Sequence, residues 1–258
     1  MKRITNIHNK AIVAGSVLSA ACLMLASSSS LALSATTTVK TSPWCSNLSN
    51  EAGTLTSKLS TLQGQVTQAW SQQDQKLVAA EQQVDQEVAT DRQQADTQRA
   101  ADFTKLEAKA TTAAETAAVQ TYEAAVNNAV TARRSAYDVA AQTYRNGVKT
   151  AITGRRTTVS TQLSTFQDSV SSAISSAETS CSATPNNGPA IRLTFQANLK
   201  SARLTFQGER SGDSSVSSEV MQLAVTRKAA FAAADQTFQS SVQSAAQTLS
   251  QAFGKSGA

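Results

Sequence analysis

The chain has 258 residues, with 23 lysines and arginines against 18 aspartates and glutamates. Three of the basic residues, Lys2, Arg3 and Lys10, stand before an apolar run at 11–26. Without them, 20 basic residues (23 less 3) balance 18 acidic ones. This near-neutral balance gives no electrostatic reason to expect a nucleic acid as the partner.

A basic start followed by an apolar run indicates a secretory signal peptide. The run of 16 residues from 11 to 26 is shorter than the ~20 residues that span a bilayer, which favours cleavage over an uncleaved membrane anchor. A lipoprotein signal would need Cys22 as its lipidated residue and is the weaker alternative. Small residues permit cleavage after Ala32, Ser34 or Ala35. We expect residues 1–35 to be removed and the protein to be exported, to a periplasm, a cell surface or the medium; a bacterial source fits this signal.

Removal of the signal peptide also removes residues that could act in catalysis or bind a metal. The only histidine, His8, lies within it, as does Cys22, so the mature chain keeps two cysteines, Cys45 and Cys181. Catalytic Ser-His-Asp or Cys-His groups and histidine-based metal sites are thereby excluded. The sequence predicts a non-enzymatic protein without a cofactor, a catalytic residue or a metal site.

Two cysteines in an exported chain indicate a disulfide, because the compartments outside the cytoplasm are oxidising. A bond between Cys45 and Cys181 within one chain would close a loop of more than a hundred residues. A bridge between two chains is the alternative, since spacing alone does not settle connectivity.

The region 46–180 contains no proline and is dominated by Ala, Gln, Thr and Ser, which predicts an all-α protein. Within it a pattern recurs: Thr, an aromatic residue, Val or Leu four residues later, and Ala three residues further on. Its copies begin at Thr121, Thr143, Thr165, Thr194 and Thr237, and the first three are 22 residues apart.

Apolar residues also recur every 11 residues, a spacing called a hendecad, as in Val119 and Val130 or Val148 and Val159. A hendecad makes three helical turns, so such series form one apolar stripe along a helix. A longer internal copy relates 133–148 to 227–242. Because repeat units of this kind cannot bury their apolar face alone, we expect them to stack or pair. The predicted repeat core comprises Val119, Tyr122, Val126, Val130, Tyr137, Tyr144, Val148, Ile152, Val159, Leu163, Phe166, Val170, Ile174, Phe195, Phe206, Phe231, Phe238 and Val242.

An intrachain disulfide requires the long helical segment to fold back, and a single turn would fall near residue 113. Leu48, Leu55 and Leu62 stand seven apart in the first arm, closer to coiled-coil heptads. Acids concentrate at 74–96 and basic residues at 130–156, so antiparallel arms would place the two blocks opposite each other. A continuous helix without this turn is the alternative.

The predicted organisation has six parts. A signal peptide at 1–35 is followed by an extended linker at 36–45 and a long antiparallel helical hairpin, or coiled coil, at 46–180. A loop at 181–189 carries Pro185, Gly188 and Pro189, which are turn-forming residues. Two C-terminal helices at 190–253 follow, separated by a loop near 208–215, and 254–258 is expected to be a disordered tail.

The leading functional hypothesis is a structural, spacer or interaction module outside the cytoplasm, with a protein partner or self-association through its helices. The hendecad repeat, with its doubled 22-residue form, is similar to that of exchangeable apolipoproteins over about half of the chain, although theirs is punctuated by proline and richer in Leu and Lys. That resemblance implies binding to lipid or a membrane surface as the alternative. The dibasic pairs Arg133-Arg134 and Arg155-Arg156 are candidate contacts for an anionic partner, or else surface residues facing the acidic arm. A holdase chaperone with helical arms is a third hypothesis.

Overall fold

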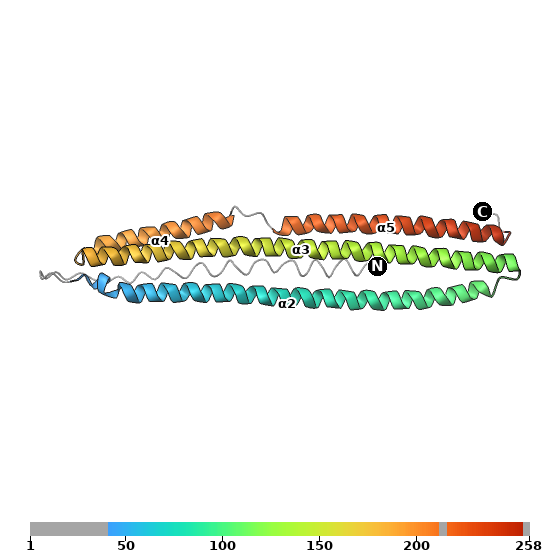
Figure 1. Ribbon diagram of the computed structural model, residues 1–258, viewed down its shortest axis with the longest axis horizontal. Helices are drawn as coiled ribbons and strands as arrows, with labels where there is room; N and C mark the ends of the chain where they lie inside the picture. Colours follow the sequence, from blue (N-terminus) through green and yellow to red (C-terminus); the bar gives the residue numbers. More distant parts are fainter. Residues whose placement is uncertain (1–40, 212–215, 255–258) are drawn as a thin grey trace. The chain divides into compact units, whose positions relative to one another are not determined.

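The structure is a computed structural model that describes residues 41–211 and 216–254. The described residues form four helices and no strand: α2 (Pro43–Glu107), α3 (Ala113–Ala183), α4 (Gly188–Ser211) and α5 (Val216–Ala252) (Figure 1). The prediction of an all-α protein is confirmed. The predicted signal peptide at 1–35 and most of the predicted tail, 255–258, lie outside the described residues. Across the described ranges, no helix is both long and apolar enough to traverse a bilayer.

The chain divides into two compact units. The first contains the residues up to Glu81 together with 155–214, and the second contains Gln82–Gly154 and the residues from Ser215 onward. Helices α2 and α3 contribute to both units, whereas α4 belongs to the first and α5 to the second. Each unit therefore contains one stretch of α2, one stretch of α3 and one C-terminal helix.

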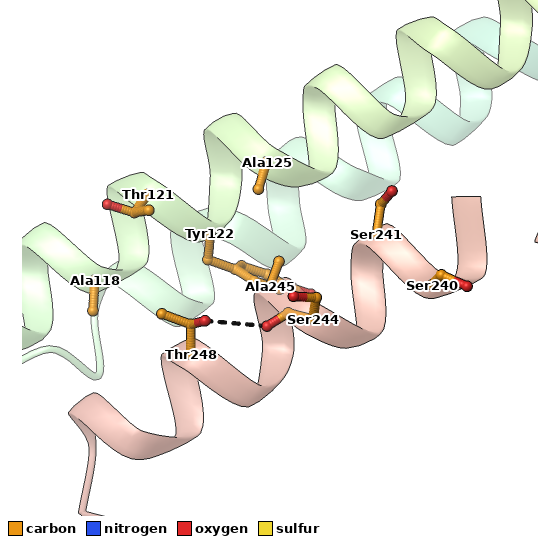
Figure 2. A pocket seen from close by; sticks show the side chains of 9 residues that line it. All are labelled: Ala118, Thr121, Tyr122, Ala125, Ser240, Ser241, Ser244, Ala245 and Thr248. Atoms are coloured by element: carbon orange, nitrogen blue, oxygen red, sulfur yellow. Dashed lines mark hydrogen bonds between the residues drawn. The ribbon is translucent and has the colours of Figure 1, made fainter. Parts of the chain in front are cut away.

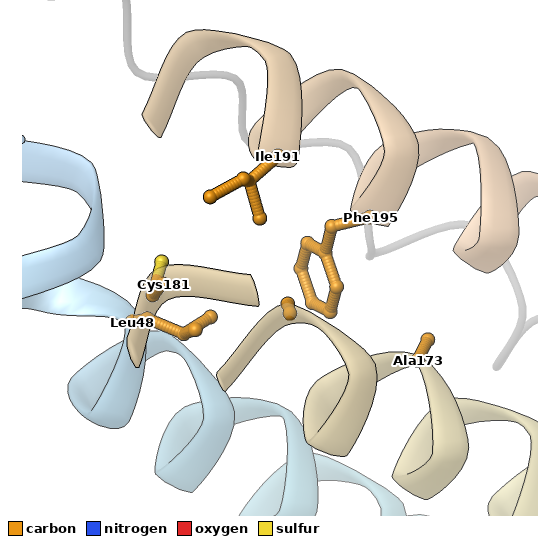
Figure 3. Packing of buried hydrophobic residues seen from close by; sticks show 6 residues of the cluster. Leu48, Ala173, Cys181, Ile191 and Phe195 are labelled. Carbon is orange, nitrogen blue, oxygen red and sulfur yellow. The ribbon is translucent and has the colours of Figure 1, made fainter. Parts of the chain in front are cut away.

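The core of the first unit is a small apolar cluster that joins all three of its helices (Figure 3). Leu48 of α2 is 2% exposed, and Ile191 and Phe195 of α4 pack with it against Ala173 and Ala177 of α3. The alanines keep the surface of α3 narrow, so that larger side chains of the neighbouring helices meet over it. Trp44 extends the cluster, with its ring centroid 5.8 Å from that of Phe195.

A disulfide between Cys45 and Cys181 closes the same end of the first unit. It joins the first turn of α2 to the last turns of α3, with the two Cα atoms 5.6 Å apart. Beside it, the amide of Ser42 donates a 2.6 Å hydrogen bond to the Pro185 carbonyl. A Cβ atom at Gly188 would overlap the Ser42 side chain, so glycine is required for this close approach.

In the second unit, α2 and α3 are joined by a short turn at 108–112. Thr112 and Glu115 form a capping box: the Glu115 amide donates to Thr112 Oγ1 (3.1 Å), and the Thr112 amide donates to Glu115 Oε2 (3.0 Å). The Thr111 amide donates to the same carboxylate at 2.8 Å, and these bonds lower the pKa of Glu115. The backbone thus ends one helix and starts the next without the Gly or Pro usually expected in a turn.

Several predicted boundaries differ from the observed ones. Helix α2 begins at Pro43, inside the predicted linker at 36–45, because proline fits the first turn of a helix. Helix α3 continues to Ala183, beyond the predicted loop start at 181, and ends just before Pro185 disfavours helical geometry at the preceding residue. Helix α4 begins at Gly188 and passes through Gly208, where a loop was predicted.

Candidate interaction surface

Two-pronged arginine–aspartate salt bridges join α2 to α3 within each unit. As the residue number on α2 rises, that of its partner on α3 falls by the same amount, which is the register of antiparallel helices. The guanidinium nitrogen and the carboxylate oxygen lie 2.5 to 2.8 Å apart in the four pairs. The pairs are Arg92–Asp138, Asp96–Arg134 and Asp85–Arg145 in the second unit, and Asp74–Arg156 in the first.

Asp96 is the most strongly perturbed carboxylate among these pairs. Hydrogen bonds from Arg134 and then from Arg99 lower its pKa to about 2. Its side chain is 43% exposed and that of Arg134 is 27% exposed. Exposed ion pairs stabilise a fold only slightly, so the pairs act mainly by fixing which residues of the two helices lie opposite each other.

A second set of contacts joins α3 to α5 in the second unit and consists of arginines lying over aromatic rings. Tyr137 and Phe231 stack with centroids 4.2 Å apart and planes inclined by 16°. The Arg133 guanidinium carbon lies 4.9 Å from the Phe238 centroid, and that of Arg227 lies 4.1 Å from the Tyr144 centroid. Guanidinium groups at these distances are attracted to the ring face, more strongly when they are shielded from water.

Charge and burial distinguish the two arginines of this set. Each lies over two rings, Arg133 over those of Tyr137 and Phe238 and Arg227 over those of Tyr144 and Phe231. Arg133 also has a carboxylate partner, with its Nε 2.7 Å from Asp235 Oδ1. Burial disfavours the charged form of each group, so it lowers the pKa of Arg227 and raises the pKa of Tyr144, which is only 6% exposed. Both cations are thus used to hold α5 against α3.

Small residues line the centre of α3 at intervals of one hendecad. Ala129, Ala140, Ala151 and Ala173 are all buried, and the one larger member of the series is Gln162, which is also buried. Gly147 on the same helix permits a close approach of α5, because a Cβ atom there would lie 2.6 Å from a methyl group of Leu223. Small residues at this spacing let a neighbouring helix lie close along the full length of its contact.

A shallow groove of about 510 Å³ lies between α3 and the C-terminal part of α5 (Figure 2). Tyr122 forms its aromatic wall, and its other lining side chains are alanines or hydroxyl-bearing residues. Thr248 Oγ1 donates a 3.2 Å hydrogen bond to the carbonyl of Ser244, so this hydroxyl is already engaged within α5. A groove without an ionisable side chain in its lining, apart from the phenol of Tyr122, offers hydrogen bonds and apolar contact rather than acid–base chemistry.

Every member of the predicted repeat core is buried or partly buried, including Val119 at 1% exposure and Phe195 at 4%. Of the four arginines predicted as anionic-partner contacts, Arg133, Arg134 and Arg156 pair with aspartates of this chain, and Arg155 is partly buried. The side chains on these helices with large exposed apolar area include Leu193 and Leu204 on α4 and Met221 and Val225 on α5.

Among the side chains that the structure describes, no three His, Cys, Asp or Glu residues lie close enough to hold a metal ion. No family model matches this chain, and neither the curated proteins nor the solved structures contain a match to it.

Proposed function

We propose that this chain is a non-enzymatic exported protein, in which helices with a hendecad repeat form a structural or interaction module outside the cytoplasm. The observation that carries the proposal is the use of its arginines. Side chains such as Arg134, Arg156 and Arg227, which could serve an anionic ligand, instead bind the carboxylates and rings of neighbouring helices. Arginines used in this way stabilise the pairing of helices rather than the binding of an anionic ligand.

Two further observations support parts of this proposal. Buried positions recur along α3 from Ala129 through Ala140 to Ala151, the spacing that a hendecad repeat requires. The disulfide between Cys45 and Cys181 is of the kind that persists in oxidising compartments, which supports export.

Lipid binding is the second candidate, favoured by one observation on α4. Leu193 and Leu204 stand one hendecad apart, are 68% and 57% exposed, and have Lys200 and Arg203 nearby on the same helix. Apolar residues with basic neighbours are typical of helices that lie in a membrane interface. Two leucines give only a narrow apolar face, and for this reason we place lipid binding second.

Vesicle flotation separates the two candidates. The oxidised mature chain, beginning near residue 36, is mixed with vesicles of anionic phospholipid and with vesicles of phosphatidylcholine alone. The proposal expects the protein to remain at the bottom of the gradient in both mixtures. Flotation with the anionic vesicles, lost in the double variant Leu193→Ser and Leu204→Ser but retained in Met221→Ser, would replace the module hypothesis with lipid binding.

Export is tested separately, by fractionating cells that produce the full chain and sequencing the N-terminus of the recovered protein. The proposal expects the protein outside the cytoplasm, beginning between Leu33 and Thr36. A cytoplasmic protein that retains Met1 would contradict it.

A further inference from the structure

The contacts between α3 and α5 join equivalent residues of two copies of one sequence pattern. The segments 133–148 and 227–242 are copies of each other, so that Arg133 corresponds to Arg227, Tyr137 to Phe231 and Tyr144 to Phe238. In the second unit, Tyr137 stacks on Phe231, its own counterpart. Arg133 lies over Phe238 and Arg227 lies over Tyr144, so each copy's arginine contacts the other copy's distal ring. The contacts are therefore related by a local two-fold axis: it interchanges the two helices and maps the Arg133–Phe238 contact onto the Arg227–Tyr144 contact.

A surface that pairs with its own copy is also complementary to a second molecule, because isologous contacts of this kind are those of two-fold dimers. In a single chain the two copies satisfy each other. Two chains satisfy the same contacts if each donates α5 to the other's α3, and the residues of these contacts then keep the same partners. Such an exchange needs no new interface.

Positions where the two copies differ favour the pairing of α3 with α5 over the pairing of two α3 or two α5 helices. Asp235, which pairs with Arg133 at 2.7 Å, corresponds to Ala141 in the other copy. Leu223, which fills the space above Gly147, corresponds to Ala129. Two α3 helices would lack both Asp235 and Leu223. Two α5 helices would place Ser241, the counterpart of Gly147, against Leu223. The pairing that the side chains favour is therefore α3 with α5, whether the two helices belong to one chain or to two.

Helix α5 has few buried side chains, which favours its exchange between chains. Among the described side chains of this 37-residue helix, Val220 alone is buried, and the shallow groove beside Tyr122 leaves the C-terminal part of α5 incompletely packed. Its covalent neighbour α4 belongs to the other unit, so α5 is connected to one unit and packs in the other. Elements with few buried apolar contacts open at a lower free-energy cost than the rest of a structure.

We propose that a second copy of this chain is a partner of the α3 face, and that the two molecules exchange α5 to form a closed dimer. The proposal rests on the proposed function and deepens it by naming a partner for the interaction module. Its test depends neither on export nor on lipid, so that the two proposals fail separately.

A charge exchange between chains tests this directly. In Arg133→Asp, two aspartates face each other at positions 133 and 235, and in Asp235→Arg, two arginines do; this holds for a closed monomer and for an exchanged homodimer alike. When the two variants are mixed, only an exchanged heterodimer places opposite charges at both of its 133–235 contacts. One contact then holds the native Arg133–Asp235 pair, and the other holds the same two charges reversed. We expect the mixture, after partial unfolding in urea with the disulfides intact and dilution, to sediment at twice the mass of one chain. Each variant alone should show several-fold less dimer.

A mixture that stays monomeric while circular dichroism shows both variants to be helical would overturn the proposal. Cross-linking supplies a second measurement in case either variant folds poorly. Tyr137→Cys in one chain and Phe231→Cys in a differently tagged chain are mixed and treated with a short bis-maleimide, which leaves the native disulfides untouched. A covalent heterodimer is expected, and it should be absent when Met221→Cys replaces Phe231→Cys. Its absence in both mixtures, with folded chains, would show that α5 stays on its own α3.

Discussion

Replacing Gly147 with alanine measures how closely α5 packs on α3. Within a helix, alanine is favoured over glycine by about 1 kcal/mol. The added Cβ atom, however, would lie 2.6 and 2.7 Å from the two methyl carbons of Leu223, closer than the ~3.5–4.0 Å of favourable carbon contacts. Leu223 must therefore move, and overpacking of this kind costs about 1–3 kcal/mol. Since Leu223 is only partly buried and flexible, we expect a cost at the lower end, which cancels or slightly exceeds the helix gain.

Gly154 supplies the matched control on the same helix. A Cβ atom there would meet no atom within 4 Å, so Gly154→Ala should gain the full helix preference of about 1 kcal/mol. Urea unfolding followed by circular dichroism gives the free energy of each variant. Gly154→Ala should exceed Gly147→Ala in stability by about 1 kcal/mol or more.

A double-mutant cycle with Leu223→Ala separates crowding from any other effect at Gly147. If the methyl groups of Leu223 are the obstacle, Gly147→Ala should be more favourable by about 1 kcal/mol when Leu223 is already alanine. Equal gains for Gly147→Ala and Gly154→Ala, together with additive effects of Gly147→Ala and Leu223→Ala, would refute the packing of α5 on α3 at this position.

Three further perturbations act elsewhere in the two units. Replacing Cys45 and Cys181 with alanine frees a loop of 136 residues, which in the chain-entropy model costs up to about 5 kcal/mol; urea unfolding should show a large loss, and an unchanged midpoint would contradict this. Burial, and then the nearby charge of Glu107, raises the pKa of Glu123, so its contribution to stability is present below its unfolded pKa of 4.5 and is lost as pH rises through the folded value. Glu123→Gln should therefore stabilise the chain at pH 7 but not at pH 4, and equal effects at both would count against it. Asp96, with its pKa lowered to about 2, contributes stability that is lost as pH falls from 3.8 toward 2; Asp96→Asn should flatten the unfolding midpoints over this window and leave their dependence above pH 5 unchanged.

Much of the helical arrangement could be predicted because it follows from periodicity and charge. The absence of proline across 46–180 predicts long helices, and the separate acidic and basic blocks predict which stretches lie opposite each other. The pairs Asp85–Arg145 and Asp74–Arg156 are members of those blocks. The turn was predicted near 113 from the cysteine positions alone and lies at 108–112.

Helix ends were predicted less well, because they depend on individual side chains. The capping box Thr112-Ala113-Ala114-Glu115 has the Ser/Thr-x-x-Glu/Gln pattern and could have located the start of α3, although the segment resembles no ordinary turn. Gly208 suggested a loop, yet α4 continues through it. There the ring centroids of Phe206 and Phe166 lie 5.3 Å apart. An aromatic pair contributes about 0.5–1.5 kcal/mol, which is comparable with the ~1 kcal/mol that a helical glycine costs.

The pairing of α5 with α3 lay beyond the sequence for a different reason. In the sequence, apolar residues recur about every eleven positions, which is close to three helical turns, so the spacing alone permits pairing of two copies at several shifts. The choice among these shifts depends on positions where the repeat is broken. Gly147 accepts Leu223, and Asp235 selects Arg133.

If α5 is exchanged between chains as we propose, these breaks specify one register for both the intrachain and the interchain pairing. Shifting α5 by one repeat would leave Leu223 without the space above Gly147 and Arg133 without Asp235. An α5 from a second chain placed in the same register meets every one of these side chains unchanged. The irregular positions therefore discriminate between registers but not between copies of the chain, and that choice is left to concentration and to the free energy of opening α5.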